Sequence, residues 1–532
     1  MKILVCDPIS TQGIALLQQR PEFEVVVLPK RLAEAELLPL VQDAVALVVR
    51  SETKVTKKVI EAAPALRVVG RAGVGVDNVD VEAATQRGVV VMNTPAGNTL
   101  STAELSFAMI LSLARKVPQA HASMAAGKWD RKQYQGVELA GKTLGVLGMG
   151  RIGCEVAKRA IAFGMRVMGY DPFLTEARAR GMGVEMAREL DNVYRDADFI
   201  TVHMPVTDQT RGMLNAGAFA RMKPKVCIVN CARGEIIAEN DLLAALDSGK
   251  IAGAALDVFS TEPLPAEHPF RKHPGITLTP HLGASTNEAQ EKCGIEVAEV
   301  ITGYLLTGEV RNAVNLPYLD AKTYEQVRPY LVLGEKLGKL LAQLTPTQAD
   351  RLHITYGGKA QELPNIDPVT RAVLLGFLSR ASVQDLNNVN VRGIASTLGL
   401  TVEEKRSSEP VTFNEWLHIQ VSRDGEKVAS AGGTFFGSPD NPRIVRVFSQ
   451  PTEIVPFGNV LLLKNKDRPG IVGYLGTLLS RHKVNIASMS LSRDTVGGHA
   501  LTVLNLDSVP PAEALEELQR DPDISNVKVV QL

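Results

Sequence analysis

A glycine-rich turn flanked by apolar segments constrains the fold of this chain more than any other feature. The apolar run Thr143–Leu147 leads into the turn GMGRIG, and helical apolar spacing follows over Cys154–Phe163. A second apolar run, Arg166–Tyr170, ends at the acidic residue Asp171. Strand, glycine turn, helix, strand and acidic residue in this order are typical of a dinucleotide-binding βαβ unit.

Each glycine of the turn has a separate role in such a unit. Gly148 allows the tight turn, Gly150 lets backbone amides approach a pyrophosphate, and Gly153 lets the helix pack closely on the strand. The positive end of the helix dipole favours the same anion. Asp171 follows the last glycine by close to the ~20 residues expected of a carboxylate that binds the adenosine ribose. Because this carboxylate repels a 2′-phosphate, the predicted cofactor is NAD and not NADP.

The composition is that of a soluble globular protein with several domains. The 532 residues suffice for roughly three or four domains of ~150 residues each. Lys plus Arg and Asp plus Glu are both 58, so no net charge points to nucleic acid or an anionic membrane as a partner. We find no signal peptide, no apolar run of about 18 residues, and five scattered cysteines that suggest reduced thiols without a metal site. We therefore expect a cytoplasmic protein.

Short apolar runs alternate with helical stretches on both sides of one long apolar segment, which predicts two Rossmann-like α/β units with parallel sheets. The long segment, Asn98–Val117, is expected to be a helix that bridges them. The runs of the first unit are Lys2–Asp7, Phe23–Leu28, Ala46–Arg50, Arg67–Arg71 and Val89–Asn93. The six runs expected to form the doubly wound sheet of the second are Thr143–Leu147, Arg166–Tyr170, Phe199–His203, Val226–Asn230, Gly253–Val258 and Ile276–Thr279. A helical pattern over Ser285–Gly303 is expected to return the chain to the first unit.

The remainder of the chain has no glycine-rich site. The segment Asn315–Tyr318 is the predicted boundary, and a mixed α/β domain is expected behind it. Its strand candidates are Leu352–Tyr356, Trp416–Val421, Lys427–Ala431 and Arg443–Phe448. From Val460 onward, the predicted order of strands and helices is βαββαβ. The predicted domains are 1–97 with 285–316 for the substrate, 98–284 for NAD, 317–453 for the mixed domain and 454–532 for the last unit.

Three side chains that suit hydride transfer follow strands of the second unit. Arg233, Glu262 and His281 each come after one of its last three predicted strands. Because ligands bind outside the carboxyl ends of the strands in open α/β sheets, we expect the three to converge on the cofactor. His281 suits the acceptance of a hydroxyl proton, Glu262 the support of its other ring nitrogen, and Arg233 the binding of a substrate carboxylate. For any one of them alone, a capping or loop residue is the competing interpretation.

Four motifs in order carry a family resemblance over about Met1–Pro317. GMGRIG with YDP, NCARGEII, LDVFSTEP and PHLGAS resemble the D-isomer-specific 2-hydroxyacid dehydrogenases, in which the Arg, Glu and His of these motifs are catalytic. RAGVGVDNVD and NTPAGNTLSTAEL narrow the resemblance towards the phosphoglycerate dehydrogenases, which implies 3-phosphoglycerate as the substrate. Besides the glycines and Asp171, the implied cofactor contacts are Val74, Arg151, Ile152, His203, Cys231, Ala232, Arg233, Asp257, His281, Gly283 and Ala284.

A phosphate site has to be found separately, since many members of this family act on small uncharged substrates. Positive and polar residues at strand ends or loop starts of the first unit would face the cleft between the two units in the predicted topology. Arg131 in the stretch KWDRK adds positive charge, although an ordinary surface arginine is an equally good interpretation. The substrate-binding candidates are Arg50, Ser51, Arg71, Gly75, Asn98 and Arg131.

The last unit resembles an ACT domain, a small-molecule sensor, over KDRPGIVGYLGTLLSRHKVNIASMSLSR, and the segment before it is similar in position and size to the intervening domain of the long-form phosphoglycerate dehydrogenases. L-serine is a possible effector, because the helix start after RPG favours a carboxylate and Asp467 suits an ammonium group. Asn465 and Asn485 are the further effector candidates, at a site expected where two such units pair edge to edge. A purely structural role in assembly is the alternative.

Motifs and resemblance together predict NAD-dependent oxidation of 3-phospho-D-glycerate to 3-phosphohydroxypyruvate in serine biosynthesis, by a homo-oligomer expected to be a tetramer. A hydroxypyruvate or glyoxylate reductase is a close alternative, but such chains usually stop near Pro317. The alternative from another class is a nucleotide-sensing protein similar to the transcriptional co-repressors of this scaffold. Such proteins can retain the catalytic residues, so the three residues alone do not exclude it, but the C-terminal sensor favours the enzyme.

Overall fold

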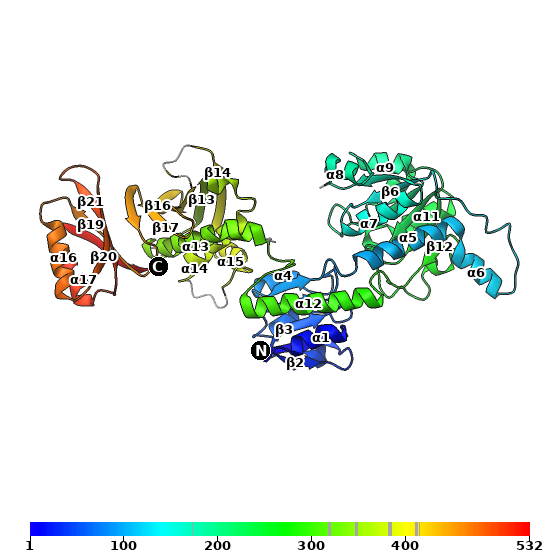
Figure 1. Cartoon of the computed structure of the whole chain (residues 1–532), viewed down its shortest axis with the longest axis horizontal. Coiled ribbons are helices and arrows are strands. Elements are labelled where there is room, and N and C mark those ends of the chain that lie inside the picture. Colours follow the sequence, from blue (N-terminus) through cyan, green and yellow to red (C-terminus); the bar gives the residue numbers. More distant parts are fainter. Residues whose placement is uncertain (173, 318–320, 346–348, 381–385, 410–412, 414) are drawn as a thin grey trace.

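The strands in the described part of the chain form four separate sheets, which follow one another along the chain (Figure 1). The computed structural model describes residues 1–172, 174–317, 321–345, 349–380, 386–409, 413 and 415–532, and the statements below concern these residues. Tyr318, the end of the predicted domain boundary, lies outside them. None of the described helices is long and apolar enough to cross a membrane.

The first sheet is parallel and covered on both faces, which explains why its strands are short apolar runs. The strand order is β2-β1-β3-β4-β5. α1 (Thr11–Gln18) and α12 (Asn287–Thr307) share one face, where Gly13 and Gly294 are so close that an added Cβ on Gly13 would overlap the Gly294 carbonyl. The strands are β1 (Lys2–Val5), β2 (Glu24–Val27), β3 (Ala44–Val49), β4 (Val68–Arg71) and β5 (Val90–Asn93), and the helices of the other face are α2 (Glu34–Leu37), α3 (Lys57–Glu61) and α4 (Val81–Gln86).

The second sheet has seven parallel strands, whereas six were predicted from the apolar runs. The additional strand, β8 (Glu185–Met186), pairs with β7 over two residues and is too short to form such a run. In the order β12-β11-β10-β9-β6-β7-β8, the glycine turn follows β6, an interior strand between β9 and β7. The other strands are β6 (Thr143–Leu147), β7 (Arg166–Tyr170), β9 (Phe199–Val202), β10 (Val226–Asn230), β11 (Ile251–Leu256) and β12 (Ile276–Leu278).

The helices of the second unit include the long one that was predicted over Asn98–Val117. It is α5 (Thr99–Arg115), which ends where Lys116 adopts φ 51°, and a second helix, α6 (Val117–Ala125), follows it. The others are α7 (Arg151–Ala162), α8 (Glu176–Gly181), α9 (Leu190–Asp196), α10 (Ala216–Arg221), α11 (Glu239–Asp247) and the 3₁₀ turns η1 (Gly234–Ile236) and η2 (Pro269–Lys272).

The third sheet is mixed, in the order β14-β13-β15-β16-β17-β18, with α13 (Ala321–Leu344) and α14 (Asp367–Leu378) on one face. Its two edge strands, β14 (Thr401–Ser407) and β18 (Gln450–Ile454), were not predicted because their sequences TVEEKRS and QPTEI have no apolar alternation. The remaining elements are β13 (Arg351–Gly358), η3 (Lys359–Glu362), α15 (Val391–Thr397), β15 (Glu415–Arg423), β16 (Glu426–Phe435) and β17 (Pro442–Val447).

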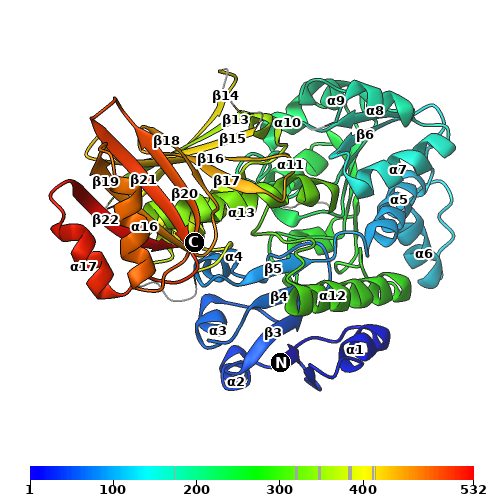
Figure 2. The same ribbon diagram turned by 60° about the vertical axis from the view of Figure 1, so that its left-hand side comes forward.

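The fourth sheet has the predicted βαββαβ order and is antiparallel, with strand order β20-β21-β19-β22. Its helices cover one face, while the other face packs on the third unit; Figure 2 shows β18 alongside β20 and β21. The elements are β19 (Asn459–Lys466), α16 (Ile471–Arg481), β20 (Ile486–Arg493), β21 (His499–Leu506), α17 (Ala512–Arg520) and β22 (Ile524–Gln531). The predicted fold class is therefore confirmed: two Rossmann-like units, a mixed α/β unit and an ACT-like unit.

Candidate active site

The glycine turn between β6 and α7 has the geometry that a pyrophosphate site needs. Gly148 adopts φ 95°, and an added Cβ would lie 2.5 Å from the carbonyl oxygen of His203. An added Cβ on Gly153 would overlap the Gly148 carbonyl, so this glycine lets α7 start close to β6. Gly150, the N-cap of α7, has open space within 4 Å of an added Cβ among the described residues. The helix start is therefore open to an anion, and the residues present fit NAD.

Asp171 lies beside this turn, directly after β7. Its Oδ2 accepts a hydrogen bond of 2.8 Å from the backbone N–H of Met149 inside the glycine turn. This holds the carboxylate where the ribose of a dinucleotide seated on the turn would lie. Arg151 and Ile152 form the first turn of α7, with Arg151 exposed and Ile152 half-buried.

His281 and Glu262 form a hydrogen-bonded pair in the loops after β12 and β11. Nδ1 of His281 lies 2.7 Å from Oε2 of Glu262, whose other carboxylate oxygen accepts from the Phe259 N–H at 3.0 Å. Burial disfavours the Glu262 carboxylate, but the hydrogen bond and charge of His281 outweigh burial and lower the pKa of Glu262. The His281 side chain is 48% exposed. Since the pair uses Nδ1, a proton transfer at this histidine would take place at Nε2.

The buried carboxylate of Asp257 holds the loop that carries His281. Its Oδ1 accepts from Thr279 Oγ1 at 2.6 Å and from the Leu282 N–H at 2.7 Å, and its Oδ2 accepts from the Gly283 N–H at 2.9 Å. His281 itself adopts φ 55° and donates its N–H to the Asp257 carbonyl at 2.9 Å. Burial raises the pKa of Asp257 despite these hydrogen bonds. In this structure the predicted cofactor contact Asp257 thus orders the loop of His281.

Arg233 connects the loops at the ends of the first two sheets. Asn230, the last residue of β10, shapes the preceding loop by donating to the Arg233 carbonyl and accepting from the Ala232 N–H. Nε of Arg233 donates to Oδ2 of Asp77 at 3.0 Å, and Asp77 belongs to the loop between β4 and α4. An added Cβ on Gly75 in that loop would overlap the Arg233 guanidinium, so the close approach requires glycine. Arg233 therefore spans the cleft between the two units.

Arg71, at the end of β4, is a largely buried guanidinium in the same cleft. Burial and the neighbouring Arg233 cation lower the pKa of Arg71 to about 10, although the charge of Asp77 opposes them. Within the described structure, the buried atoms Nε of Arg71 and Oδ1 of Asn98 have no hydrogen-bond partner. Buried polar atoms in native proteins normally have partners. Nε of Arg71 is a donor that suits an anion, and Oδ1 of Asn98 is an acceptor that suits a hydroxyl group.

Arg50 and Ser51 lie directly after β3, beside this group. The Arg50 backbone is held by the Asp7 carboxylate, which accepts from its N–H at 2.6 Å. Arg50 and Ala284 line the same small cavity, so the first unit and the loop after His281 meet there. Ser51 is exposed.

Three further predicted cofactor contacts also lie at strand ends. His203 follows β9, with Nε2 3.0 Å from Thr201 Oγ1, and burial lowers the pKa of His203 to about 3, so its ring is neutral at pH 7. Burial raises the pKa of the Cys231 thiol, after β10, to about 12. Val74 follows β4, and its carbonyl accepts from Asn93 Nδ2 at 2.6 Å. The carboxyl ends of both sheets thus contribute to one region.

Arg131 is the substrate candidate that the single chain does not bring to this region. It is exposed in the segment after α6, which lies on the side of the second unit away from the first (Figure 1). Asp77, by contrast, was missed as an individual residue, although its motif RAGVGVDNVD was recognised. The acidic residue in that glycine-rich loop was the available indication, but only the fold shows that its partner is Arg233.

The effector candidates do not meet within one chain. Asp467 lies beyond the last residue of β19, where Arg493 and the Gly497 N–H donate to it, whereas Asn485 precedes β20 and donates to Asp507. Because β19 and β20 both pair antiparallel with β21, these two positions are at opposite ends of the sheet. Asn465 is 1% exposed and accepts from Thr502. A site that uses both ends would need two chains.

Comparisons with known proteins decide the family. Residues 107–283 match the NAD binding domain of the D-isomer specific 2-hydroxyacid dehydrogenases, residues 326–448 the D-3-phosphoglycerate dehydrogenase intervening domain, and residues 459–523 the ACT domain. Over 532 residues the chain is 41% identical to the D-3-phosphoglycerate dehydrogenase of Methanocaldococcus jannaschii, with 100% of each chain covered. The chain belongs to the D-3-phosphoglycerate dehydrogenase family.

Further relatives of this family agree with that assignment. The D-3-phosphoglycerate dehydrogenase of Bacillus subtilis is 40% identical over 533 residues, with 100% of this chain and 99% of the relative covered. Among solved structures, the NAD⁺-bound 3-phosphoglycerate dehydrogenase of Entamoeba histolytica is 29% identical and has a TM-score of 0.51, covering 60% of this chain and 99% of that one. The resemblance, the dehydrogenase class and NAD as the cofactor are thus confirmed.

Proposed function

We propose that this chain catalyses the NAD-dependent oxidation of 3-phospho-D-glycerate to 3-phosphohydroxypyruvate, which is the first step of phosphorylated L-serine biosynthesis. The observation that carries the proposal is full-length similarity to D-3-phosphoglycerate dehydrogenases. NAD seated on the glycine turn supplies the hydride acceptor. The side chains of the protein bind the carboxylate and the phosphate of the substrate and take up the proton of its hydroxyl group.

In this proposal His281 is the general base. Its Nε2 accepts the proton of the C2 hydroxyl, while Nδ1 stays hydrogen-bonded to Glu262 at 2.7 Å. The lowered pKa of Glu262 keeps its carboxylate ionised at neutral pH, and this charge stabilises the imidazolium formed in the step. Asp257 supports the reaction through the loop hydrogen bonds that orient His281.

Arg233 is the proposed ligand of the substrate carboxylate. Its present partner, Asp77, is 72% exposed, and exposed ion pairs contribute only ~0–1 kcal/mol. Charge-assisted hydrogen bonds to a substrate held in the cleft contribute ~1.5–3 kcal/mol each, so Arg233 can bind the substrate carboxylate while it stays paired with Asp77. The candidates for the phosphate and remaining polar groups of the substrate are Arg50, Ser51, Arg71, Gly75, Asn98 and Arg131.

NADH formation by the purified full chain tests the reaction with 3-phosphoglycerate, D-glycerate and D-lactate side by side. We expect NADH formation with 3-phosphoglycerate. For D-glycerate and D-lactate, which lack the phosphate, kcat/KM should be at least about tenfold lower, because the loss of one charge-assisted hydrogen bond lowers binding by about that factor. Failure to oxidise 3-phosphoglycerate while NADH still binds would refute the proposal and favour a nucleotide-sensing protein. A preference for D-glycerate would favour a hydroxypyruvate reductase.

The proposed effector is L-serine, bound between the ACT-like units of two chains. β20 pairs only with β21 in the described structure, which leaves its other edge for a second copy. Edge-to-edge pairing of antiparallel two-fold type would bring Asp467 of one copy towards Asn485 of the other. Serine titration of the full chain, followed by calorimetry and activity, tests this. Absence of binding at millimolar serine would leave the unit as an assembly module.

The proposed assembly is a homotetramer in the cytoplasm. The proposed domains are residues 1–97 together with 285–316, residues 98–284, residues 317–453 and residues 454–532. The changes of sheet along the chain support this division. Light scattering of the purified chain measures the assembly. Limited proteolysis tests the boundaries, because cuts are expected first near 317 and 454 and not within sheets.

A further inference from the structure

A short segment of the third unit, Leu386–Asn390, contacts the C-terminal end of helix α4 in the first unit. Nδ2 of Asn387 donates to the carbonyl of Gly88 at 2.9 Å, across 299 positions of the chain. Val389 is 4% exposed and lies in the hydrophobic cluster between the first sheet and α12. One hydrogen bond and one apolar side chain from the third unit thus reach into the substrate-binding unit.

The segment is shaped before it reaches α4. Oδ1 of Asn387 accepts from the Val389 N–H at 2.9 Å, and Oδ1 of Asn390 accepts from the Asn387 N–H at 2.9 Å. With its oxygen used to close this turn, the Asn387 amide presents its N–H₂ group to Gly88. The contact therefore depends on the donor half of one side chain, and the turn depends on its acceptor half.

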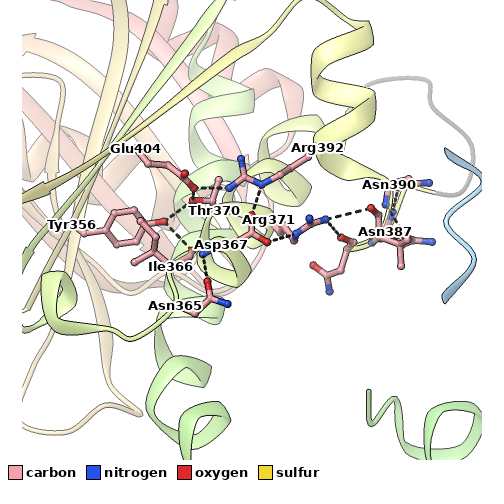
Figure 3. Close-up of polar contacts among 12 residues, drawn as sticks. Tyr356, Asn365, Ile366, Asp367, Thr370, Arg371, Asn387, Asn390, Arg392 and Glu404 are labelled. Carbon is pink, nitrogen blue, oxygen red and sulfur yellow. Dashed lines mark hydrogen bonds and ion pairs between the residues drawn. The ribbon is translucent and has the colours of Figure 1, made fainter. Parts of the chain in front are cut away.

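A polar network fixes the segment to the body of the third unit (Figure 3). Arg371 donates to the carbonyl of Asn388 at 2.6 Å and pairs through Nε with Asp367 at 2.6 Å. Arg392 bridges Asp367 and Glu404, so the network connects α14, α15 and β14. All four charged side chains are less than one-third exposed. Such a partly buried network holds its members more rigidly than exposed pairs do.

Gly88 is adapted to this contact. It directly follows the C-cap of α4 with φ 71°, where glycine is favoured, and an added Cβ would overlap the Asn387 amide. Both the backbone conformation and the space therefore require glycine. A side chain at this position would push the Asn387 segment away from the helix.

The loop that precedes the N-terminal end of α4 belongs to the candidate active site. Asp80 caps the helix start by accepting from the Ala83 N–H at 2.9 Å, and the loop before it carries Asp77, the partner of Arg233. α4 is one short rigid helix, about 9 Å long at 1.5 Å per residue. A displacement at Gly88 would therefore be passed to the loop of Asp77.

We propose that Asn387 is a positioning residue of the dehydrogenase: by holding Gly88 it sets α4 and the Asp77 loop, and so orients Arg233 for the substrate carboxylate. The proposal rests on the proposed role of Arg233. The contact also connects the third unit to the active site. Because the third unit shares its hydrophobic core with one face of the ACT-like sheet, the ACT-like unit is connected to the same contact through the third unit.

The substitution Asn387→Asp in the full chain tests the proposal. It keeps the oxygen that closes the turn, removes the donor to Gly88 and sets a carboxylate against that carbonyl. We expect KM for 3-phosphoglycerate to rise about twofold to tenfold, the equivalent of one neutral hydrogen bond, with kcat and KM for NAD nearly unchanged. Asn388→Asp is the matched control, because its exposed side chain lies in the same segment and it introduces the same charge.

A double-mutant cycle with Asp77→Ala separates positioning from a general effect on the fold. If Asn387 acts through Asp77, Asn387→Asp adds no further rise in KM in the Asp77→Ala background. Equal effects in both backgrounds, or an Asn388→Asp variant that matches Asn387→Asp, would overturn the proposal. If Asp77→Ala and Arg233→Lys both leave KM unchanged, the role of Arg233 itself is wrong, which is a distinguishable result.

Discussion

Replacing His281 by asparagine tests the proposed base with little disturbance to the fold. His281 adopts φ 55°, a left-handed conformation that asparagine tolerates better than most residues, and its backbone bond to Asp257 is kept. The lost pair with Glu262 joins side chains that are 48% and 35% exposed, so it costs about 1 kcal/mol or less of folding free energy. Loss of the base removes ~10²–10⁴-fold in kcat, which is ~3–5 kcal/mol of transition-state stabilisation. The catalytic effect should therefore exceed the structural one several-fold.

Three measurements on the His281→Asn variant separate these effects. Initial rates at saturating 3-phosphoglycerate give kcat, titration of NADH fluorescence gives the dissociation constant, and urea unfolding gives the stability. We expect kcat to fall by far more than threefold, the dissociation constant of NADH to change by less than about threefold, and the free energy of unfolding to fall by about 1 kcal/mol or less. His121→Asn is the control, since His121 is exposed on α6. A kcat near that of the wild type, or an equal loss in the control, would refute the assignment of His281 as the base.

Three further predictions concern the cofactor, the phosphate and pH. Asp171→Ala should raise kcat/KM for NADP relative to NAD, because it removes the carboxylate beside the glycine turn; an unaltered ratio would place the ribose elsewhere. Arg71→Ala should raise KM for 3-phosphoglycerate about tenfold or more and leave KM for D-glycerate within about threefold, as expected of a phosphate ligand; equal changes would contradict that role. His203 has a pKa of about 3 when folded and ~6.5 when unfolded, so the unfolded chain binds more protons below pH 6.5 and stability falls as the pH drops. Between pH 7.5 and 5.5 the wild type should lose ~1.4 kcal/mol more than His203→Gln in urea unfolding, and parallel losses would show that His203 is not buried in its neutral form.

The parts of the fold that were predicted from the sequence are those with strong local patterns. The runs Thr143–Leu147 and Arg166–Tyr170 coincide with β6 and β7, because a parallel strand covered on both faces must be apolar along its length. The strands that were missed, β8, β14 and β18, are short or lie at sheet edges. They are held by backbone pairing with a neighbour, which leaves little trace in residue type.

In the candidate site, the sequence likewise predicted some of the residues, and only the structure showed some of their contacts. Arg233, Glu262 and His281 could be proposed because each follows a strand, and parallel strands bring their carboxyl ends to one edge. The hydrogen bond between His281 and Glu262 agrees with that expectation. Asp257 stays a predicted cofactor contact, and the structure adds that its carboxylate accepts from the backbone N–H groups of Leu282 and Gly283 in the His281 loop.

The sequence by itself determined the dinucleotide-binding turn, because Gly148 adopts a left-handed conformation and Gly153 approaches the Gly148 carbonyl five residues before it, whereas the close approach of His203 to Gly148 comes from the fold. Only the tertiary structure decided that Arg233 meets Asp77 and that Asn387 meets Gly88, contacts that span 156 and 299 positions. No local pattern encodes such pairs, since each partner alone is an ordinary polar or small residue. They exist because the packing of separate hydrophobic cores brings the loops together, and that packing is a property of the whole chain.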